Sequence, residues 1–471
     1  MSGATYRAQP SVRSGHAAPR ASLGIRDVMA LVVGVVIGAG IFSVPSVVAA
    51  NSGSATTLMM AWVLGGAISL AGALCYAELA TSYPHSGGEY HFLKLAFGDK
   101  VAFLFAWARL TVIPTGSIAL LGFVFGDYAA QVLPIAGGWS SGLYAALAVV
   151  VLTAINVVGL QSGRRTQNLL TLLQVGGVVA IVVAGLALPV PTEPLPAAAN
   201  AGTSNWGLVL IFVMLAYGGW NEAAYISAEV VGATRNLPRA LVLSIAAITG
   251  LYLLMNFAYL RVLGLADMGT SPAVAADMMG RVLGGRGAQV ISAIVAVAAL
   301  TSMNATVLMA ARTTYAFGRA APMFAALGRW NPRLESPVHA LLVQGTISLA
   351  LIGLGIATRR GFTTMVEYTA PVFWLFFLLT GVALFVLRAR SAPRVRRPFS
   401  VPLYPLTPLV FCAMSAYLLY ASVRHTGAGA LVGLLVLGVG ALVLLIGGER
   451  AVPAAGLQNA VESSTYDQGE P

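Results

Sequence analysis

The stretch "VGVVIGAGIFSVPSVV", residues 33–48, has glycine at positions 38 and 40 and proline at position 45, inside a long apolar segment. An interior glycine costs a helix about 1 kcal/mol relative to alanine, and an interior proline costs about 3 kcal/mol. In a bilayer, unwound backbone is tolerated only where it lines a cavity or is buried in protein. The stretch therefore predicts either a close helix-packing contact through Gly34 and Gly38 or a membrane helix interrupted near its middle.

The composition indicates a membrane protein. Of the 471 residues, 58% are hydrophobic and only 9% are charged, whereas soluble domains carry about 25% charged residues. At about 20 apolar residues per crossing, the sequence predicts an all-α protein with about twelve transmembrane helices. The expected spans are 27–50, 58–80, 100–131, 142–160, 167–190, 206–231, 239–263, 286–318, 338–357, 362–388, 402–423 and 427–447.

The formal net charge of +11 is explained by topology rather than by nucleic-acid binding. Basic residues precede the first span and then cluster in alternate loops, for example at 164–165 and 235–239, while the loop at 132–141 has none. This positive-inside bias predicts a multi-pass protein of the cytoplasmic membrane with both termini in the cytoplasm. Cys75 and Cys412 lie in apolar spans and indicate no disulfide framework. No metal-ligand clustering, phosphate loop or nucleophile–base pattern is found, so we expect no metal, no cofactor and no enzymatic activity.

The chain is expected to divide into four parts. Residues 1–24 form an N-terminal tail, 25–390 a ten-helix core, 400–448 two peripheral helices, and 449–471 a polar, disordered tail. Both tails are expected in the cytoplasm.

A second interrupted helix is expected in "FVMLAYGGWNEAAYISAEV", where Gly218 and Gly219 lie near mid-span. If the core consists of halves at about 25–190 and 206–390, both interruptions fall in the first helix of a half. Five helices per half would give the two halves opposite orientations, which is the arrangement of transporters built from inverted repeats. This match favours unwinding over helix packing in the first span as well.

Two interrupted helices that cross at mid-membrane can bind a zwitterion. Amides that begin a half-helix carry partial positive charge and suit a carboxylate, whereas the carbonyls that end one suit an ammonium group. The interruptions therefore predict a site for an α-amino acid held by its own two charges.

Four segments, in order, resemble the APC superfamily of amino acid permeases, and in particular its L-type amino acid transporter (LAT) branch, of prokaryotic type. They are "VIGAGIF" (36–42), "CYAELATSYPHSGGEYHFLKLAFG" (75–98), "LAYGGWNEA" (215–223) and "EVVGATRNLPRAL" (229–241). The likeness extends from residue 24 to about 390. It implies a 5+5 inverted-repeat core with unwound helices 1 and 6, and secondary active transport by alternating access.

The resemblance also implies a substrate site made largely of backbone. The substrate carboxylate is expected on the amides of Ala39, Gly40 and Ile41, and the ammonium on the carbonyls of Val36, Leu215, Ala216 and Gly218. Tyr217, Trp220 and Asn221 follow the family pattern and are expected to shape the pocket. Leu215 replaces a bulky aromatic residue, which predicts looser closure.

Two departures from the family pattern affect coupling and partners. Gln174 stands where many members have a lysine, and a neutral amide cannot cycle a proton near pH 7, which argues against proton coupling there. The loop at 133–142 lacks the cysteine by which animal LAT subunits join an ancillary glycoprotein, so we expect no such subunit.

Polar groups within the spans are further candidates because each is costly in a membrane. Glu222, beside the second interruption, is expected either to act on substrate or a proton or to be a structural carboxylate bound to freed amides or to an arginine. Arg109 is expected to be structural and paired with an acidic residue, and Glu229 to be a gate or loop contact. Thr301 or Ser302 could contribute to a sodium site with carbonyls of the first helix, or could bond to their own helix.

The leading hypothesis is thus a secondary transporter of amino acids that binds a small-molecule substrate within the lipid bilayer. Antiport or symport, and coupling to protons or sodium, stay open. The alternative is a carrier of a polyamine or other organic amine, by exchange or linked to protons, because Glu222 would favour a cation. Glycine interruptions at mid-depth argue against a membrane enzyme, and interruptions in two inverted halves argue against a channel.

Overall fold

The computed structural model describes residues 23–447 apart from residue 86, residues 135–138, 159–163, 190–202, residue 335, residues 391–396 and residue 426. The expected tail at 449–471, and that at 1–24 except for its last two residues, lie outside the described residues. The described part is helical, and its only β-type pairs are the isolated bridges Leu23–Val230 and Asn331–Ser336.

The first half of the core begins with an interrupted crossing formed by α1 (Ile25–Val36), η1 (Ala39–Phe42) and α2 (Val44–Ala50). Its other helices are α3 (Ala55–Ser82), α4 (Gly88–Phe97), α5 (Asp99–Thr111), α6 (Ile113–Val132), α7 (Ser140–Val158) and α8 (Arg164–Ala187). Of these, α5 and α6 together form one crossing.

The second half begins with another interrupted crossing, formed by α9 (Trp206–Ala216), η2 (Trp220–Ala224) and η3 (Ser227–Glu229). Its other helices are α10 (Ala233–Thr270), α11 (Val274–Ala320), η4 (Pro322–Phe324), α12 (Val338–Thr358) and α13 (Gly361–Arg390). Two further helices, α14 (Leu406–His425) and α15 (Ala428–Gly447), complete the fold.

Nine helical segments of the described chain are long and apolar enough to cross a membrane. The two interrupted crossings and α8, with its apolar part Gln174–Ala187, account for three more. The predicted twelve-crossing, all-α architecture is confirmed, with the first and sixth crossings unwound.

Local sequence explains several helix ends. The Ser54 side chain accepts a hydrogen bond from the Thr57 amide at 3.1 Å and caps α3, while Asn205 caps α9 by accepting from Leu208 at 3.2 Å. Such caps satisfy amides that have no partner within the helix. They fix the point at which each crossing begins.

Residues 264–285, which lie between the seventh and eighth expected spans, are largely helical, since α10 continues to Thr270 and α11 begins at Val274. Both helices are kinked where the expected spans end and begin. Gly264 and Gly284 leave helical geometry there with positive φ angles of 75° and 73°, which glycine tolerates without steric cost. Between the two kinks, Arg281 forms an ion pair with Asp267.

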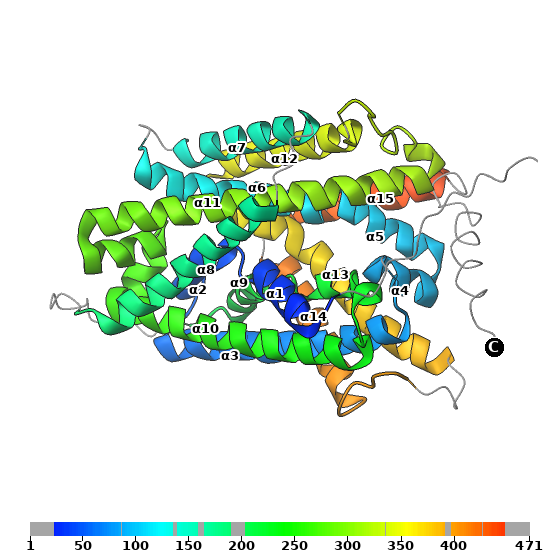
Figure 1. Cartoon of the computed structure of the whole chain (residues 1–471), viewed down its shortest axis with the longest axis horizontal. Coiled ribbons are helices and arrows are strands. Elements are labelled where there is room, and N and C mark those ends of the chain that lie inside the picture. The colour runs from blue at the N-terminus through cyan, green and yellow to red at the C-terminus, as the bar shows by residue number, and fades with distance from the viewer. Residues whose placement is uncertain are drawn as a thin grey trace, which may run out of the picture.

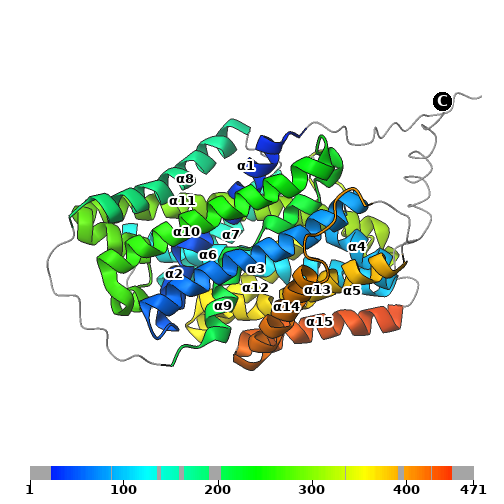
Figure 2. The ribbon, with the colours of Figure 1, turned by 90° about the horizontal axis from the view of Figure 1, so that it is seen from below.

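The helices form a bundle whose long members run along one direction (Figure 1). α3 and α10 lie side by side in both views, while α7 and α12 pack together on the opposite side in Figure 1. The interrupted crossings are positioned between these pairs. α15 lies along the edge of the bundle in Figure 2, where it packs on α13 and α5 and where Trp107 Nε1 donates to the Val436 carbonyl at 2.9 Å.

Candidate functional site

The first interruption lies between α1 and η1. The amides of Ile37 and Gly38 bond back to Val33 and Val36, at 2.8 and 2.7 Å, and Gly38 is extended, with φ −83° and ψ 179°. The chain resumes as a single 3₁₀ turn at Ala39. Pro45 stands in the first turn of α2, where its missing N–H costs no helical bond. The unwinding predicted from the glycines and the proline is confirmed.

The second interruption lies between α9 and η2. The Gly218 amide bonds to the Leu215 carbonyl at 3.0 Å, and Gly219 adopts a left-handed conformation with φ 113°. A Cβ atom at Gly219 would stand 2.7 Å from Cγ1 of Val35 in α1. The two interruptions therefore touch each other, and only glycine satisfies both the dihedral angle and the space.

One tyrosine joins the carbonyl ends of the two half-helices. The Tyr252 hydroxyl, on α10, lies 2.9 Å from the Val36 carbonyl and 3.0 Å from the Ala216 carbonyl. On the other side of the first interruption, the Gln174 amide donates to the Ile37 carbonyl. Since a carbonyl oxygen has two lone pairs, the Ala216 carbonyl keeps acceptor capacity beside this tyrosine, whereas the Val36 carbonyl also accepts from the Gly38 amide at 2.7 Å.

Replacing Tyr252 by phenylalanine is expected to lower the free energy of unfolding by about 1 kcal/mol, because both carbonyls lose their hydroxyl partner. The measurement is thermal unfolding of the purified protein in detergent. The matched control is Tyr259→Phe, because the buried Tyr259 hydroxyl has no partner among the described residues. An equal fall in both variants would contradict a role for the Tyr252 hydroxyl at the interruptions.

A cavity of about 960 Å³ lies beside the two interruptions. Its walls come from α1, α4, α5, α6, α8, α9, α11 and α13 and from both unwound segments. It extends from the interruptions toward the side of the molecule where α1 begins, as the lining residues Ala30 and Leu31 indicate. On the other side the helices are bonded together, since the Tyr128 hydroxyl donates to the Phe42 carbonyl at 2.7 Å and Ser46 to Ser271 at 2.6 Å.

The glycines of the first interruption face this cavity rather than a neighbouring helix. A Cβ atom at Gly34 or Gly40 would find no heavy atom within 4 Å, and both residues line the cavity. At Gly38 the nearest atom would be the Val35 carbonyl oxygen, 3.7 Å away in the same helix. Helix packing through these glycines, the alternative considered above, finds no partner among the described residues.

An ion pair lies at the edge of the second interruption. Arg109 Nη1 on α5 is 3.5 Å from Glu222 Oε1 on η2 and 3.4 Å from the Tyr225 hydroxyl, and its guanidinium lies 5.2 Å from the centre of the Tyr225 ring. Both charged side chains line the cavity and are mostly buried. Arg109 thus has the acidic partner that the sequence could not name.

Glu89, on α4, extends this polar group. Its carboxylate accepts from the Tyr76 hydroxyl, from the Tyr225 hydroxyl at 3.1 Å and from Asn221 Nδ2 at 3.4 Å. Burial raises the pKa of Glu89 above its ordinary value, while the hydroxyl donor and the charge of Arg109 oppose the rise. Sequence reasoning gave Glu89 no role, although it lies in one of the quoted family segments.

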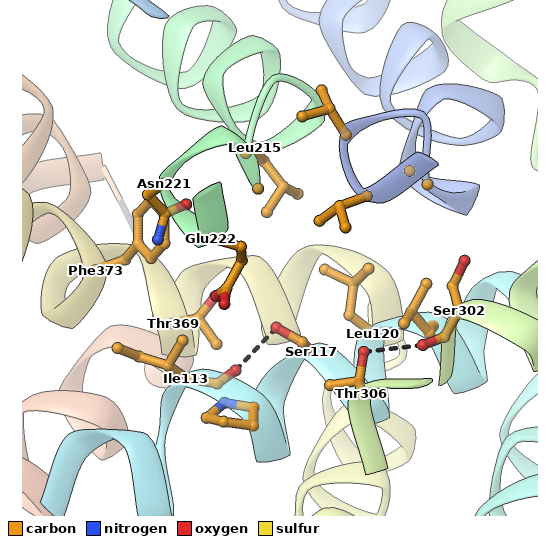
Figure 3. Close-up of a pocket in the computed structure, with 18 of the residues that line it drawn as sticks. Ile113, Ser117, Leu120, Leu215, Asn221, Glu222, Ser302, Thr306, Thr369 and Phe373 are labelled. Atoms are coloured by element: carbon orange, nitrogen blue, oxygen red, sulfur yellow. Dashed lines mark hydrogen bonds between the residues drawn. The ribbon is translucent and has the colours of Figure 1, made fainter. Parts of the chain in front are cut away.

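Most of the residues expected at the site line the cavity. They are Val36, Gly40, Gln174, Leu215, Ala216, Gly218, Asn221, Glu222, Thr301, Ser302 and Arg109. Figure 3 shows Leu215, Asn221 and Glu222 on one side of the cavity, and Ser302 and Thr306 on another. The Thr301 hydroxyl donates to its own helix, at the Val297 carbonyl 2.8 Å away, which was the alternative to a sodium site.

Of the remaining expected residues, Ala39 begins the 3₁₀ turn η1 and the other four are positioned elsewhere. Ile41 is buried away from the cavity. The Tyr217 hydroxyl donates to the Trp62 carbonyl at 2.9 Å, and the Trp220 ring packs against Tyr76, so both side chains lie behind the cavity wall. The backbone of Glu229 accepts from the Leu23 amide at 3.0 Å, which is a contact with the segment before α1.

Part of the aromatic run of α13 lines the cavity. Phe373, Trp374, Phe376 and Phe377 all contribute to the wall. The larger part of the cavity surface is therefore apolar, and its charged groups, Glu89, Arg109 and Glu222, lie near the second interruption.

Two unwound helices that meet beside a buried cavity, in a protein of twelve crossings, define a membrane transporter. The amino acid permease family model matches residues 23–442, and the chain belongs to the amino acid permease family. It is therefore an amino acid transporter and not an enzyme.

Individual relatives agree with this assignment. The chain is 31% identical to the serine/threonine exchanger SteT of Bacillus subtilis over 408 residues, covering 84% of this chain and 90% of SteT. It is 31% identical to the mouse b(0,+)-type amino acid transporter 1, covering 85% of this chain and 82% of that protein. It is also 29% identical to the human large neutral amino acids transporter small subunit 2, covering 94% and 84% of the two chains.

Proposed function

We propose that this chain exchanges α-amino acids across the cytoplasmic membrane by alternating access, and that it binds them mainly through the backbone of its two interruptions. The substrate carboxylate accepts from the amides of Ala39, Gly40 and Ile41. The substrate ammonium donates to the carbonyls of Val36, Leu215, Ala216 and Gly218. The observation that carries this proposal is the open space at Gly40, because it lets a ligand approach bare backbone at the start of a helix.

The proposed topology has both termini in the cytoplasm, in accordance with the basic loops. With that orientation, the cavity extends toward the cytoplasm, because it extends toward the start of α1. The structure then corresponds to an inward-facing state. The ten core helices at 25–390, in halves at about 25–190 and 206–390, carry out transport, while the two helices within 400–448 lie outside the repeat.

Transport is proposed to need neither a proton nor a sodium ion at the first interruption. The Gln174 amide already donates to the Ile37 carbonyl, where a bound cation would otherwise stand. An amide does not titrate near pH 7, so this contact does not depend on a proton. The absence of a cysteine from the loop at 133–142 supports a transporter that works without an ancillary glycoprotein.

The test is uptake of labelled amino acids into proteoliposomes that contain the purified protein. Uptake is expected to rise when unlabelled amino acid is present inside and to be indifferent to imposed proton or sodium gradients. An N-acetylated amino acid and the corresponding decarboxylated amine are expected not to compete, because each lacks one of the two charges. Competition by the amine as strong as that by the parent amino acid would instead establish the organic-amine alternative.

A further inference from the structure

One oxygen of the Glu222 carboxylate is paired with Arg109, and the other has no hydrogen-bond partner among the described residues. Oε1 lies 3.5 Å from Arg109, whereas Oε2 is buried and has no hydrogen-bond partner among the described residues. Figure 3 shows the side chain projecting from the second interruption into the cavity, toward Ser117 and Thr369 on the facing helices. A buried acceptor without a donor is costly, so a donor that enters the cavity gains by bonding to it.

The neighbouring hydroxyl groups of the cavity do not supply that donor. Ser117, Thr306 and Thr369 each donate to a carbonyl of their own helix, at 2.8, 2.9 and 3.0 Å. Since a hydroxyl has a single proton, none of them can also donate to Glu222. Arg109 Nε, the unpartnered buried donor of the same ion pair, does not bond to this oxygen either, so Oε2 is open to a donor on a ligand.

Apart from Arg109, Asn221 and these hydroxyl groups, the walls around Glu222 are apolar. Ile113, Leu120 and Phe373 face the same space as Glu222 in Figure 3. A substrate side chain that extends from the interruptions into this space would meet hydrocarbon walls and one strong acceptor. Such a site distinguishes side chains by whether they can donate a hydrogen bond.

We propose that Glu222 is the specificity-determining residue of this transporter, and that it selects amino acids whose side chain carries a hydrogen-bond donor over aliphatic amino acids of the same shape. This inference rests on the proposed function, because it requires the substrate backbone to be held at the interruptions. Arg109 acts as a positioning residue, since it holds the carboxylate at the cavity edge. Glu222 and Glu89 are the acidic residues of the described cavity lining, and Arg109 is its one cation, so an acidic side chain would be disfavoured.

Threonine and valine provide the sharpest comparison, because they are nearly isosteric and differ by one hydroxyl group. Because threonine can donate a hydrogen bond to a charged acceptor, its half-saturating concentration in the wild-type protein is expected to be about tenfold lower than that of valine. Glutamine and glutamate provide the second pair, and glutamate is expected to compete weakly.

The decisive variant is Glu222→Met, which keeps the length of the side chain and removes the acceptor. The ratio of the half-saturating concentration of valine to that of threonine is expected to fall to about one, with valine transport retained. Because this change leaves Arg109 without its partner, the double variant with Arg109→Met is measured as well. Replacing both members of a buried ion pair by apolar residues is often tolerated, and the double variant is expected to show the same ratio.

Ser117→Ala is the matched control. It removes a cavity hydroxyl that already donates to its own helix. The ratio of the half-saturating concentration of valine to that of threonine is therefore expected to stay at the wild-type value. A wild-type ratio of one, or a ratio that survives in both Glu222 variants, would overturn the inference while leaving amino acid transport established. Failure of the wild-type protein to transport any amino acid would instead refute the proposed function.

Discussion

Replacing Gly40 by leucine is expected to abolish transport and to leave the protein folded. No heavy atom lies within 4 Å of the place that a Cβ atom would take, so the new side chain enters the cavity instead of colliding with a neighbouring helix. There it covers the amides that we propose to bind the substrate carboxylate. Losing several charge-assisted hydrogen bonds, each worth about 1.5–3 kcal/mol, corresponds to at least a hundredfold loss of affinity.

The measurement is uptake by proteoliposomes, normalised to folded protein by size-exclusion chromatography. The matched control is Gly250→Leu, because Gly250 also has open space around its Cβ position but lies on the exposed face of α10, outside the cavity. The control is expected to transport at the wild-type rate. Normal uptake by the Gly40 variant would remove the central argument for backbone recognition.

Replacing Gly219 by alanine is expected to destabilise the protein, for reasons that have nothing to do with substrate. The left-handed dihedral costs a residue with a Cβ atom about 1–2 kcal/mol. In addition, the new Cβ atom would stand 2.7 Å from Cγ1 of Val35, so α1 must move away from η2. Together these effects predict a loss of about 2–4 kcal/mol in the free energy of unfolding.

Thermal unfolding of a double-mutant cycle separates the two contributions. Val35→Ala removes Cγ1, so the Gly219→Ala substitution is expected to cost less in that background, and the remaining cost is the dihedral strain. Equal costs in both backgrounds would show that the two interruptions do not press against each other at this point.

The interruptions themselves could be predicted because their cause is local. Paired glycines at mid-span, with Pro45 one turn further on, weaken a helix wherever it is located, and the matching position of Gly218 and Gly219 supplied a second instance. The number of crossings also followed from composition, since the length of each apolar segment is set by the thickness of the bilayer.

The contacts that complete the site could not be predicted, because they join distant parts of the chain. Tyr252 lies in an apolar helix with no local feature that distinguishes it, yet it bonds to the Val36 carbonyl 216 residues away. Arg109 and Glu222 are separated by 113 residues, so the sequence identified each of them but not the pair. The sequence indicated neither which side of the aromatic run on α13 faces the cavity nor that the Trp220 ring turns away from it.

One contact at the entrance to the bundle has a kinetic consequence. Leu23 forms two backbone hydrogen bonds with the end of η3 and the residues that follow it: its amide donates to the Glu229 carbonyl at 3.0 Å, and its carbonyl accepts from the Val231 amide at 2.9 Å. An outward tilt of α1 must either break both bonds or carry this segment with it. We expect the second course, so that α1 and the segment around η3 move together as one unit and the proposed substrate site opens in a single step.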